Sequence, residues 1–213
     1  MKGMLCKDWY LTKHNLKAFL VLIACFSLGG GLWYAHSSTF MLVYPGVMAA
    51  MLTLSLIGYD EREKWNVYCL GMPVSRALYV TEKYVCGLIS VGTVLVFHGI
   101  GALLGVLTAR SAGEEVLANM TLLLSVGLLG QALMMPFLFR FGVEKGRIAY
   151  ALLFGMLVGG LVVISTVRQA DGISLGNVEV SAALAAVAVC AASLAVYAIS
   201  WRLSVALYQK REL

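Results

Sequence analysis

The sequence has few charged residues and very few prolines. Only 13% of its 213 residues are Asp, Glu, Lys or Arg, and it contains three prolines. A soluble globular domain has about 25% charged residues, so this composition excludes an ordinary soluble enzyme as well as the disordered and collagen-like classes. Hydrophobic residues make up 61% of the chain, and the mean hydropathy is +0.86. An integral membrane protein is the class that fits.

Cysteine spacing carries no signal for a disulfide framework or a metal site. The five cysteines are odd in number, and none belongs to a C-x-x-C pair. Cys25 follows Leu-Ile-Ala in the manner of a lipoprotein cleavage box, but the apolar run continues to Ala35. We therefore interpret this region as a first span and not as a cleaved leader.

Six stretches contain no charged side chain, and each is long enough to cross a membrane. They are residues 18–35, 39–59, 84–108, 116–139, 148–167 and 180–201. A transmembrane helix needs about 20 apolar residues, whereas barrel strands are about 10 residues long and alternate in polarity. The expected fold is an all-α membrane protein with six transmembrane helices, forming one transmembrane domain over residues 1–213.

The positive charges predict the orientation. Fourteen of the sixteen Lys and Arg residues lie in the two terminal segments and in the connections between spans 2 and 3 and spans 4 and 5. The opposite side has only Arg110 and Arg168. The positive-inside rule then places both termini in the cytoplasm, as in a multi-pass protein of the bacterial cytoplasmic membrane. The Lys and Arg residues on the cytoplasmic side account for the net charge of +5, and no nucleic-acid partner is needed to explain it.

Two common catalytic motifs are absent. The sequence has no G-x-x-x-x-G-K-[ST] phosphate loop and no H-E-x-x-H. We therefore expect no catalytic residue, no metal and no cofactor in this chain.

The spans contain three ionisable or amide side chains, His98, Asn119 and Gln131, and two of them, His98 and Gln131, allow two interpretations. Buried polar groups often line a translocation path, and with the aromatic residues Tyr44 and Phe97 they are candidates for one. Alternatively, they hydrogen-bond neighbouring helices, which stabilises helix packing by about 0.6 kcal/mol per bond. No carboxylate or second histidine joins His98 within the predicted spans, which favours the second interpretation.

The connection 60–83 is the most specific segment. Asp60 and Glu63 stand at capping-box spacing, which predicts a helix start. An apolar stripe at helical spacing follows, made of Trp65, Tyr68, Cys69 and Met72. Ser75 is then in position to cap the next helix. The stripe fits either an interfacial helix on lipid headgroups or a docking helix for a cytoplasmic partner.

Here the sequence resembles bacterial type-2 ABC transporter permeases, especially the small six-span permeases of antimicrobial or phenol-soluble modulin exporters. The resemblance is carried by Asp60-Glu61-x-x-Lys64-Trp65-x-x-Tyr68, Leu70-x-Met72-Pro73-Val74-Ser75-Arg76, Val80-x-x-Lys83-Tyr84 and the opening Met1-Lys2-Gly3-x-Leu5-x-Lys7-Asp8. The family usually has Leu where this chain has Met72.

The resemblance implies a mechanism. Such permeases act as homodimers or heterodimers above separate ATP-binding subunits, which hold the ATP and Mg. Residues 60–72 would form the coupling helix, and residues 1–15 an amphipathic connector helix. The implied coupling residues are Asp60, Glu61, Glu63, Lys64, Trp65, Tyr68 and Met72, and those of the connector are Lys7, Asp8 and Trp9.

The expected function is export of amphipathic or hydrophobic cargo, such as peptides, through a dimeric path in the lipid membrane. Apolar, aromatic spans without fixed charge suit that cargo better than a small ion. Two alternatives remain at this stage: an integral membrane enzyme or protease, and an ion-coupled secondary transporter. The first needs clustered catalytic groups inside the bundle, and the second favours buried carboxylates and repeated halves.

Overall fold

The computed structural model describes residues 2–32, 39–72, 74–108, 113–148, 151–152, 155, 159 and 182–210. The helices bounded within them are α1 (Lys2–Asn15), α2 (Lys17–Leu32), α3 (Thr39–Arg62), α4 (Trp65–Leu70), α5 (Arg76–Leu107), α6 (Gly113–Phe141) and α8 (Ala182–Gln209). Residues 143–148 are helical as well. The all-α prediction is confirmed for the described part of the chain.

Four of the helices, α3, α5, α6 and α8, are long and apolar enough to cross a membrane. A fifth crossing is obtained if α1 and α2, which meet at an angle of 81°, count as one bent span. The predicted span 148–167 lies mostly outside the described residues. The structure therefore shows a multi-pass helical membrane protein, while the number six stays a prediction.

The third predicted span begins later than the helix that contains it. The predicted span starts at residue 84, but α5 starts at Arg76, where the Ser75 hydroxyl accepts a hydrogen bond from the Leu78 N–H at 3.2 Å. The predicted cap at Ser75 is confirmed. Because α5 is continuous from Arg76, the charged residues Glu82 and Lys83 lie within this long helix and not in a loop.

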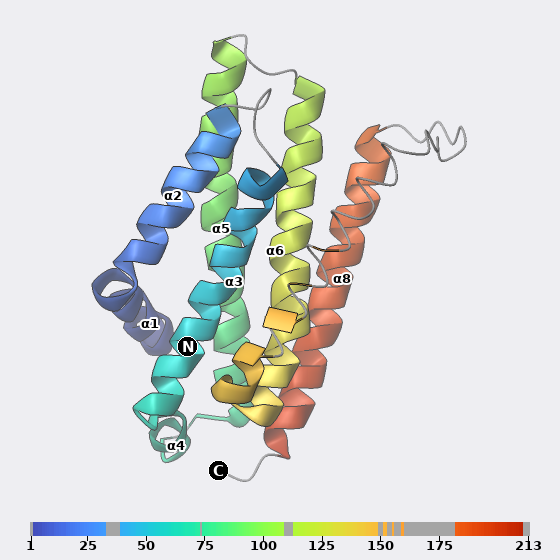
Figure 1. Cartoon of the computed structure of the whole chain (residues 1–213). Helices are drawn as coiled ribbons and strands as arrows, with labels where there is room; N and C mark the ends of the chain where they lie inside the picture. The colour runs from blue at the N-terminus through green and yellow to red at the C-terminus, as the bar shows by residue number, and fades with distance from the viewer. Residues whose placement is uncertain are drawn as a thin grey trace.

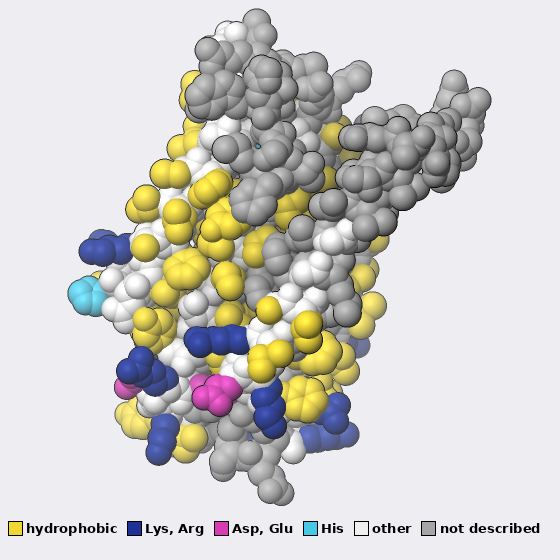
Figure 2. All heavy atoms as spheres, in the orientation of Figure 1, with side chains coloured by type: hydrophobic (Ala, Val, Ile, Leu, Met, Phe, Trp, Pro, Cys, Tyr) yellow, Lys and Arg dark blue, Asp and Glu magenta, His cyan; other side chains and the backbone are white. Residues whose placement is uncertain are grey.

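The helices form a bundle in which α6 packs along α8, α2 packs along α5, and α3 lies against α2, α5 and α6. Figure 1 shows α1, α4 and the C-terminal end of α8 at the same end of the bundle. On the face shown in Figure 2, hydrophobic side chains follow the helices, and charged side chains gather near that end and beside α1. This distribution fits a chain that spans a membrane and meets water at the α4 end.

A buried polar network joins α5, α6 and α8. The Gln131 side chain donates to the Gly87 carbonyl at 3.3 Å and to the Ser90 hydroxyl at 3.2 Å. The Tyr197 hydroxyl donates to the carbonyl of Tyr84 and to Gln131 Oε1, at 2.8 and 3.3 Å. In an apolar environment such bonds satisfy groups that would otherwise be costly to bury. The network fixes these three helices to one another.

Candidate functional site

The segment between α3 and α5 differs from the single helix expected over residues 60–72. Asp60 lies in the last turn of α3, which ends at Arg62, and α4 covers only Trp65–Leu70. Lys64 between them has a left-handed backbone with φ 53°, which interrupts the helix. The expected capping box is wrong, because the Asp60 carboxylate binds cationic side chains instead of free helix N–H groups.

Helix α4 presents a different surface from the predicted stripe. Cys69 is buried at 0% exposure, while Trp65 and Met72 pack partly against the core. The outward side chains are Val67 and Tyr68, which are 52% and 64% exposed. Tyr68 is therefore exposed together with Val67, a residue outside the predicted stripe, whereas Trp65 mainly anchors α4.

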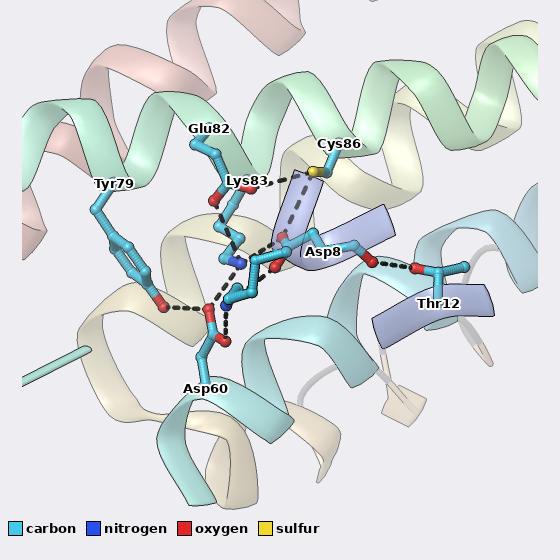
Figure 3. Close-up of polar contacts among 8 residues, drawn as sticks. Asp8, Thr12, Asp60, Tyr79, Glu82, Lys83 and Cys86 are labelled. Carbon is cyan, nitrogen blue, oxygen red and sulfur yellow. Dashed lines mark hydrogen bonds and ion pairs between the residues drawn. The ribbon is translucent and has the colours of Figure 1, made fainter. Parts of the chain in front are cut away.

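Next to α4, five charged side chains form what we name the ionic cluster: Lys7, Asp8, Asp60, Glu82 and Lys83. They come from α1, α3 and α5 (Figure 3). Lys83 Nζ lies 2.5 Å from Asp8 Oδ2 and 2.7 Å from Asp60 Oδ2. Lys7 binds the second oxygen of each carboxylate, Asp8 Oδ1 at 3.0 Å and Asp60 Oδ1. The two lysines and two aspartates thus form a closed ring.

The fifth member, Glu82, stands beside this ring. Its Oε2 lies 3.3 Å from Lys83 Nζ, and its Oε1 accepts a hydrogen bond from the Cys86 thiol at 3.3 Å. Tyr79 closes the other side of the cluster, where its hydroxyl donates to Asp60 Oδ2 at 3.2 Å. The ring contains two positive and two negative charges, so Glu82 is the carboxylate in excess.

The cluster is withdrawn from water. Asp8, Asp60, Glu82 and Lys83 have side-chain exposures of 2, 3, 0 and 1%, whereas that of Lys7 is 25%. Burial raises the pKa of Asp8, but the ammonium group of Lys83, the side chain of Glu82 and the ammonium group of Lys7 together outweigh this effect and hold that pKa below its ordinary value of 3.8. Buried charges persist only when they are paired in this way, since an unpaired one is strongly destabilising.

The buried face of α1 differs from the apolar face expected of an amphipathic connector helix. Its buried residues are Met4, Asp8 and Thr12, one turn apart, while Trp9 is 60% exposed. The predicted connector helix is present, but its buried face is largely polar and an aromatic residue faces outward. Of the expected connector residues, Lys7 and Asp8 bind the core of the site, and Trp9 is free to contact lipid or a partner.

The predicted coupling residues separate into two groups. Glu63 and Lys64 are exposed beside α4, as is Tyr68. Asp60 belongs to the ionic cluster, and Glu61 Oε2 accepts a hydrogen bond from the backbone N–H of Val143 at 2.8 Å. These two acids therefore bind other parts of the bundle, and Asp60 is withdrawn from the surface, whereas Glu61 is half-buried.

The candidate path residues are buried or half-buried in the bundle. His98 and Gln131 are both fully buried, and the amide of Gln131 is used in the network between helices. Tyr44 lies against Phe26 with ring centroids 4.6 Å apart, and Phe97 is half-buried. The role of these residues in a translocation path stays a prediction.

Sequence reasoning missed the inner half of the site, namely Tyr79, Glu82 and Cys86. A signal was present: Tyr79, Lys83 and Cys86 repeat at helical spacing and place polar groups on one face of α5. It is hard to recognise because Glu82 and Lys83 directly precede an apolar run and count with the charged connection between the second and third predicted spans.

The chain matches a known protein family over nearly its whole length. The family described as ABC-2 family transporter protein matches residues 3–209, nearly the whole chain. Comparisons with curated proteins and with solved structures gave no match. The chain therefore belongs to the ABC-2 transporter family and is a type-2 ABC transporter permease, the membrane component of a transport system.

Proposed function

From membership in the ABC-2 family and the geometry of the α4 end, we propose that this chain is the permease of an ATP-driven exporter, with α4 as its coupling helix. The observation that carries the assignment is the family match over residues 3–209. The family implies an ABC ATPase partner, and α4 is the element with the form of a docking site for it.

Two features of α4 support docking. It is held apart from α3 and α5 by non-helical residues, and it exposes Val67 and Tyr68 beside the charged side chains of Glu63 and Lys64. An exposed aromatic residue with a charged rim is typical of a protein interface. Its reverse face is fixed, because Cys69 is buried and Lys7 Nζ lies 4.8 Å from the centre of the Trp65 ring.

The ionic cluster supplies the mechanical connection. Asp60 lies five residues before α4 and is bonded to Lys83 of α5 and to Lys7 of α1. A displacement of α4 by an ATPase subunit is therefore transmitted to three helices at once, since moving any one of them alone separates buried charges.

The dimer and the cargo are further parts of the proposal. We propose that two copies, or this chain and a related permease, form the path, and that the cargo is amphipathic or hydrophobic, with peptides as the main class. The support is the scarcity of charge in the long helices, where the two charged residues in the interior of α5, Glu82 and Lys83, are engaged in the ionic cluster. Apolar walls favour apolar cargo.

The ion-coupled alternative predicts buried carboxylates, and Asp8, Asp60 and Glu82 are buried. However, Lys7 and Lys83 neutralise the two aspartates, so of the three carboxylates only Glu82 has no cation of its own. The family match likewise favours ATP-driven transport over that alternative and over an integral membrane enzyme.

Co-purification tests the docking step. The permease is expressed with the ABC ATPase encoded next to it, and the ATPase recovered with a tagged permease is quantified. The double variant Val67→Ala/Tyr68→Ala is expected to reduce recovery by about tenfold or more, because aromatic interface anchors are worth about 2 kcal/mol. The matched control is Ile199→Ala/Leu203→Ala, which truncates two residues of α8 that are 66% and 51% exposed.

Unchanged recovery with the α4 double variant would mean that α4 is not the docking element. For the cargo, ATP hydrolysis by the reconstituted complex is expected to rise with amphipathic peptides. A rise with sugars or inorganic ions, and none with peptides, would exclude the cargo class that we propose.

A further inference from the structure

A polar pocket of about 280 Å³ opens on the bundle at the ends of α2 and α3, apart from the ionic cluster. Its polar wall contains Arg62, Arg147, Tyr59 and Ser55, and its apolar wall contains Leu16 and Phe19. Arg62 is the last residue of α3, and Arg147 belongs to the helical residues 143–148. Two arginines thus reach one pocket from separate segments.

Gly58 lies at the point where the two segments meet. A Cβ atom at position 58 would lie 3.4 Å from Val143 Cγ1 and 3.8 Å from Arg147 Nη2. The segment 143–147 therefore lies directly on α3, which brings the guanidinium of Arg147 to the same side as Arg62. A larger residue at position 58 would occupy the space between them.

The pocket carries uncompensated positive charge. No carboxylate lines it, and among the residues that the structure describes neither Arg62 nor Arg147 is ion-paired or hydrogen-bonded through its guanidinium. By contrast, Lys7 and Lys83 of the ionic cluster are paired with the carboxylates of Asp8 and Asp60. A guanidinium has five N–H donors, and planar forks of this kind suit the oxygens of a phosphate.

The polarity of the pocket changes along the helix axis. Ser55 and Arg62 are seven residues apart on α3, which corresponds to about 10 Å. Arg62 ends the candidate span Val43–Arg62 and so lies at the membrane boundary, while Phe19 belongs to the first turn of the apolar α2. Charged and apolar walls in this order match a lipid, with its headgroup outside and its acyl chain inside.

We propose that this pocket binds the phosphate headgroup of an anionic membrane phospholipid, held by Arg62 and Arg147, with an acyl chain along Leu16 and Phe19. A free phosphate shares the headgroup chemistry. However, it would gain nothing from the apolar wall, and two unpaired arginines favour a headgroup with net negative charge over a zwitterionic one. The site is separate from α4 and does not depend on the proposed ATPase partner.

Native mass spectrometry of the full-length permease, released from detergent without its ATPase, measures this binding. We expect phosphatidylglycerol to bind about tenfold or more tightly than phosphatidylcholine. The double variant Arg62→Gln/Arg147→Gln is expected to abolish this preference. The matched control Arg202→Gln/Lys210→Gln removes two exposed charges from the C-terminal end of α8 and is expected to retain it.

Two results would overturn the proposal. The first is an equal loss of the preference for phosphatidylglycerol in both double variants. That result would show that anionic lipid is attracted to basic side chains in general and not to this pocket. The second is displacement of phosphatidylglycerol from the wild-type protein by millimolar glycerol phosphate, which would show a site for free phosphates. The second measurement needs no variant, so it decides the question even if the arginine variant fails to fold.

Discussion

The ammonium group of Lys83 lies 2.5 Å from the carboxylate of Asp8, and both side chains are almost completely buried, at 1% and 2% exposure. The two residues are 75 positions apart in the sequence and belong to α5 and α1. Their contact fixes the N-terminal helix to the bundle next to α4. The stability of the coupling end therefore depends on charge pairing as well as on apolar packing.

Removing Lys83 should be far more damaging than removing Glu82. Lys83→Met leaves Asp8 and Asp60 with only the partly exposed Lys7, which is expected to cost about 3–5 kcal/mol. Glu82→Gln leaves the ring of two lysines and two aspartates closed and should cost clearly less. Thermal unfolding in detergent, followed by a thiol-reactive dye that reports exposure of Cys69 and Cys86, measures both variants. Equal losses would contradict the assignment of Glu82 as the carboxylate in excess.

Acid should release α1 through Asp8. Because the pKa of Asp8 is lowered in the folded protein, its stabilising effect is present above the ordinary value of 3.8 and is lost as the pH falls below it. We expect unfolding to become easier below about pH 4. Asp8→Asn should be less stable at neutral pH and should show a flatter dependence in that acid range. An unchanged acid slope in the variant would show that other carboxylates control it.

A methyl group at Gly87 should disturb the polar network between α5, α6 and α8. The added Cβ would collide with the amide oxygen of Gln131 and would lie 2.8 Å from the Tyr197 hydroxyl. Gly87→Ala is therefore expected to destabilise the protein by about 1–3 kcal/mol. Gly92→Ala on the same helix is the control, because nothing lies within 4 Å of a Cβ there. Similar unfolding temperatures for the two variants would contradict this packing.

Cysteine labelling tests the predicted orientation. Cys6 of α1 is exposed, whereas Cys69 of α4 is buried, and burial also raises the pKa of the Cys69 thiol. A membrane-impermeant maleimide should label Cys6 in inside-out vesicles but not in intact cells, and Cys69 should react only after unfolding. Labelling of Cys6 in intact cells would place the N-terminus outside and overturn the positive-inside assignment.

The sequence was sufficient for the main helices, because an uncharged run of about 20 residues has few alternatives to a spanning helix. It also placed the Ser75 cap, which depends on residues only three positions apart. The break at Lys64 was not predictable, since a left-handed lysine has no local sequence signal comparable to glycine. The capping box at Asp60 failed because distant cations compete for that carboxylate.

The sequence did not predict the contacts of the ionic cluster. Tyr68, Glu63 and Lys64, which the resemblance to permeases implied as coupling residues, are exposed, and their role in coupling stays a prediction. The ionic cluster joins residues near positions 8, 60 and 83, and pairing over such separations follows from helix packing, not from spacing. Gln131 shows the same limit: its amide was equally compatible with a path and with a contact between helices until its partners were known.

Photo-crosslinking from position 68 tests the central claim most directly. A photoreactive phenylalanine analogue replaces Tyr68 in the full permease, which is irradiated in membranes together with the ABC ATPase, and Leu203 of α8 is replaced in a parallel sample. If α4 is the coupling helix, position 68 forms a covalent adduct with the ATPase and position 203 does not. Adducts of position 68 with lipid alone, or equal ATPase adducts from both positions, would contradict the account.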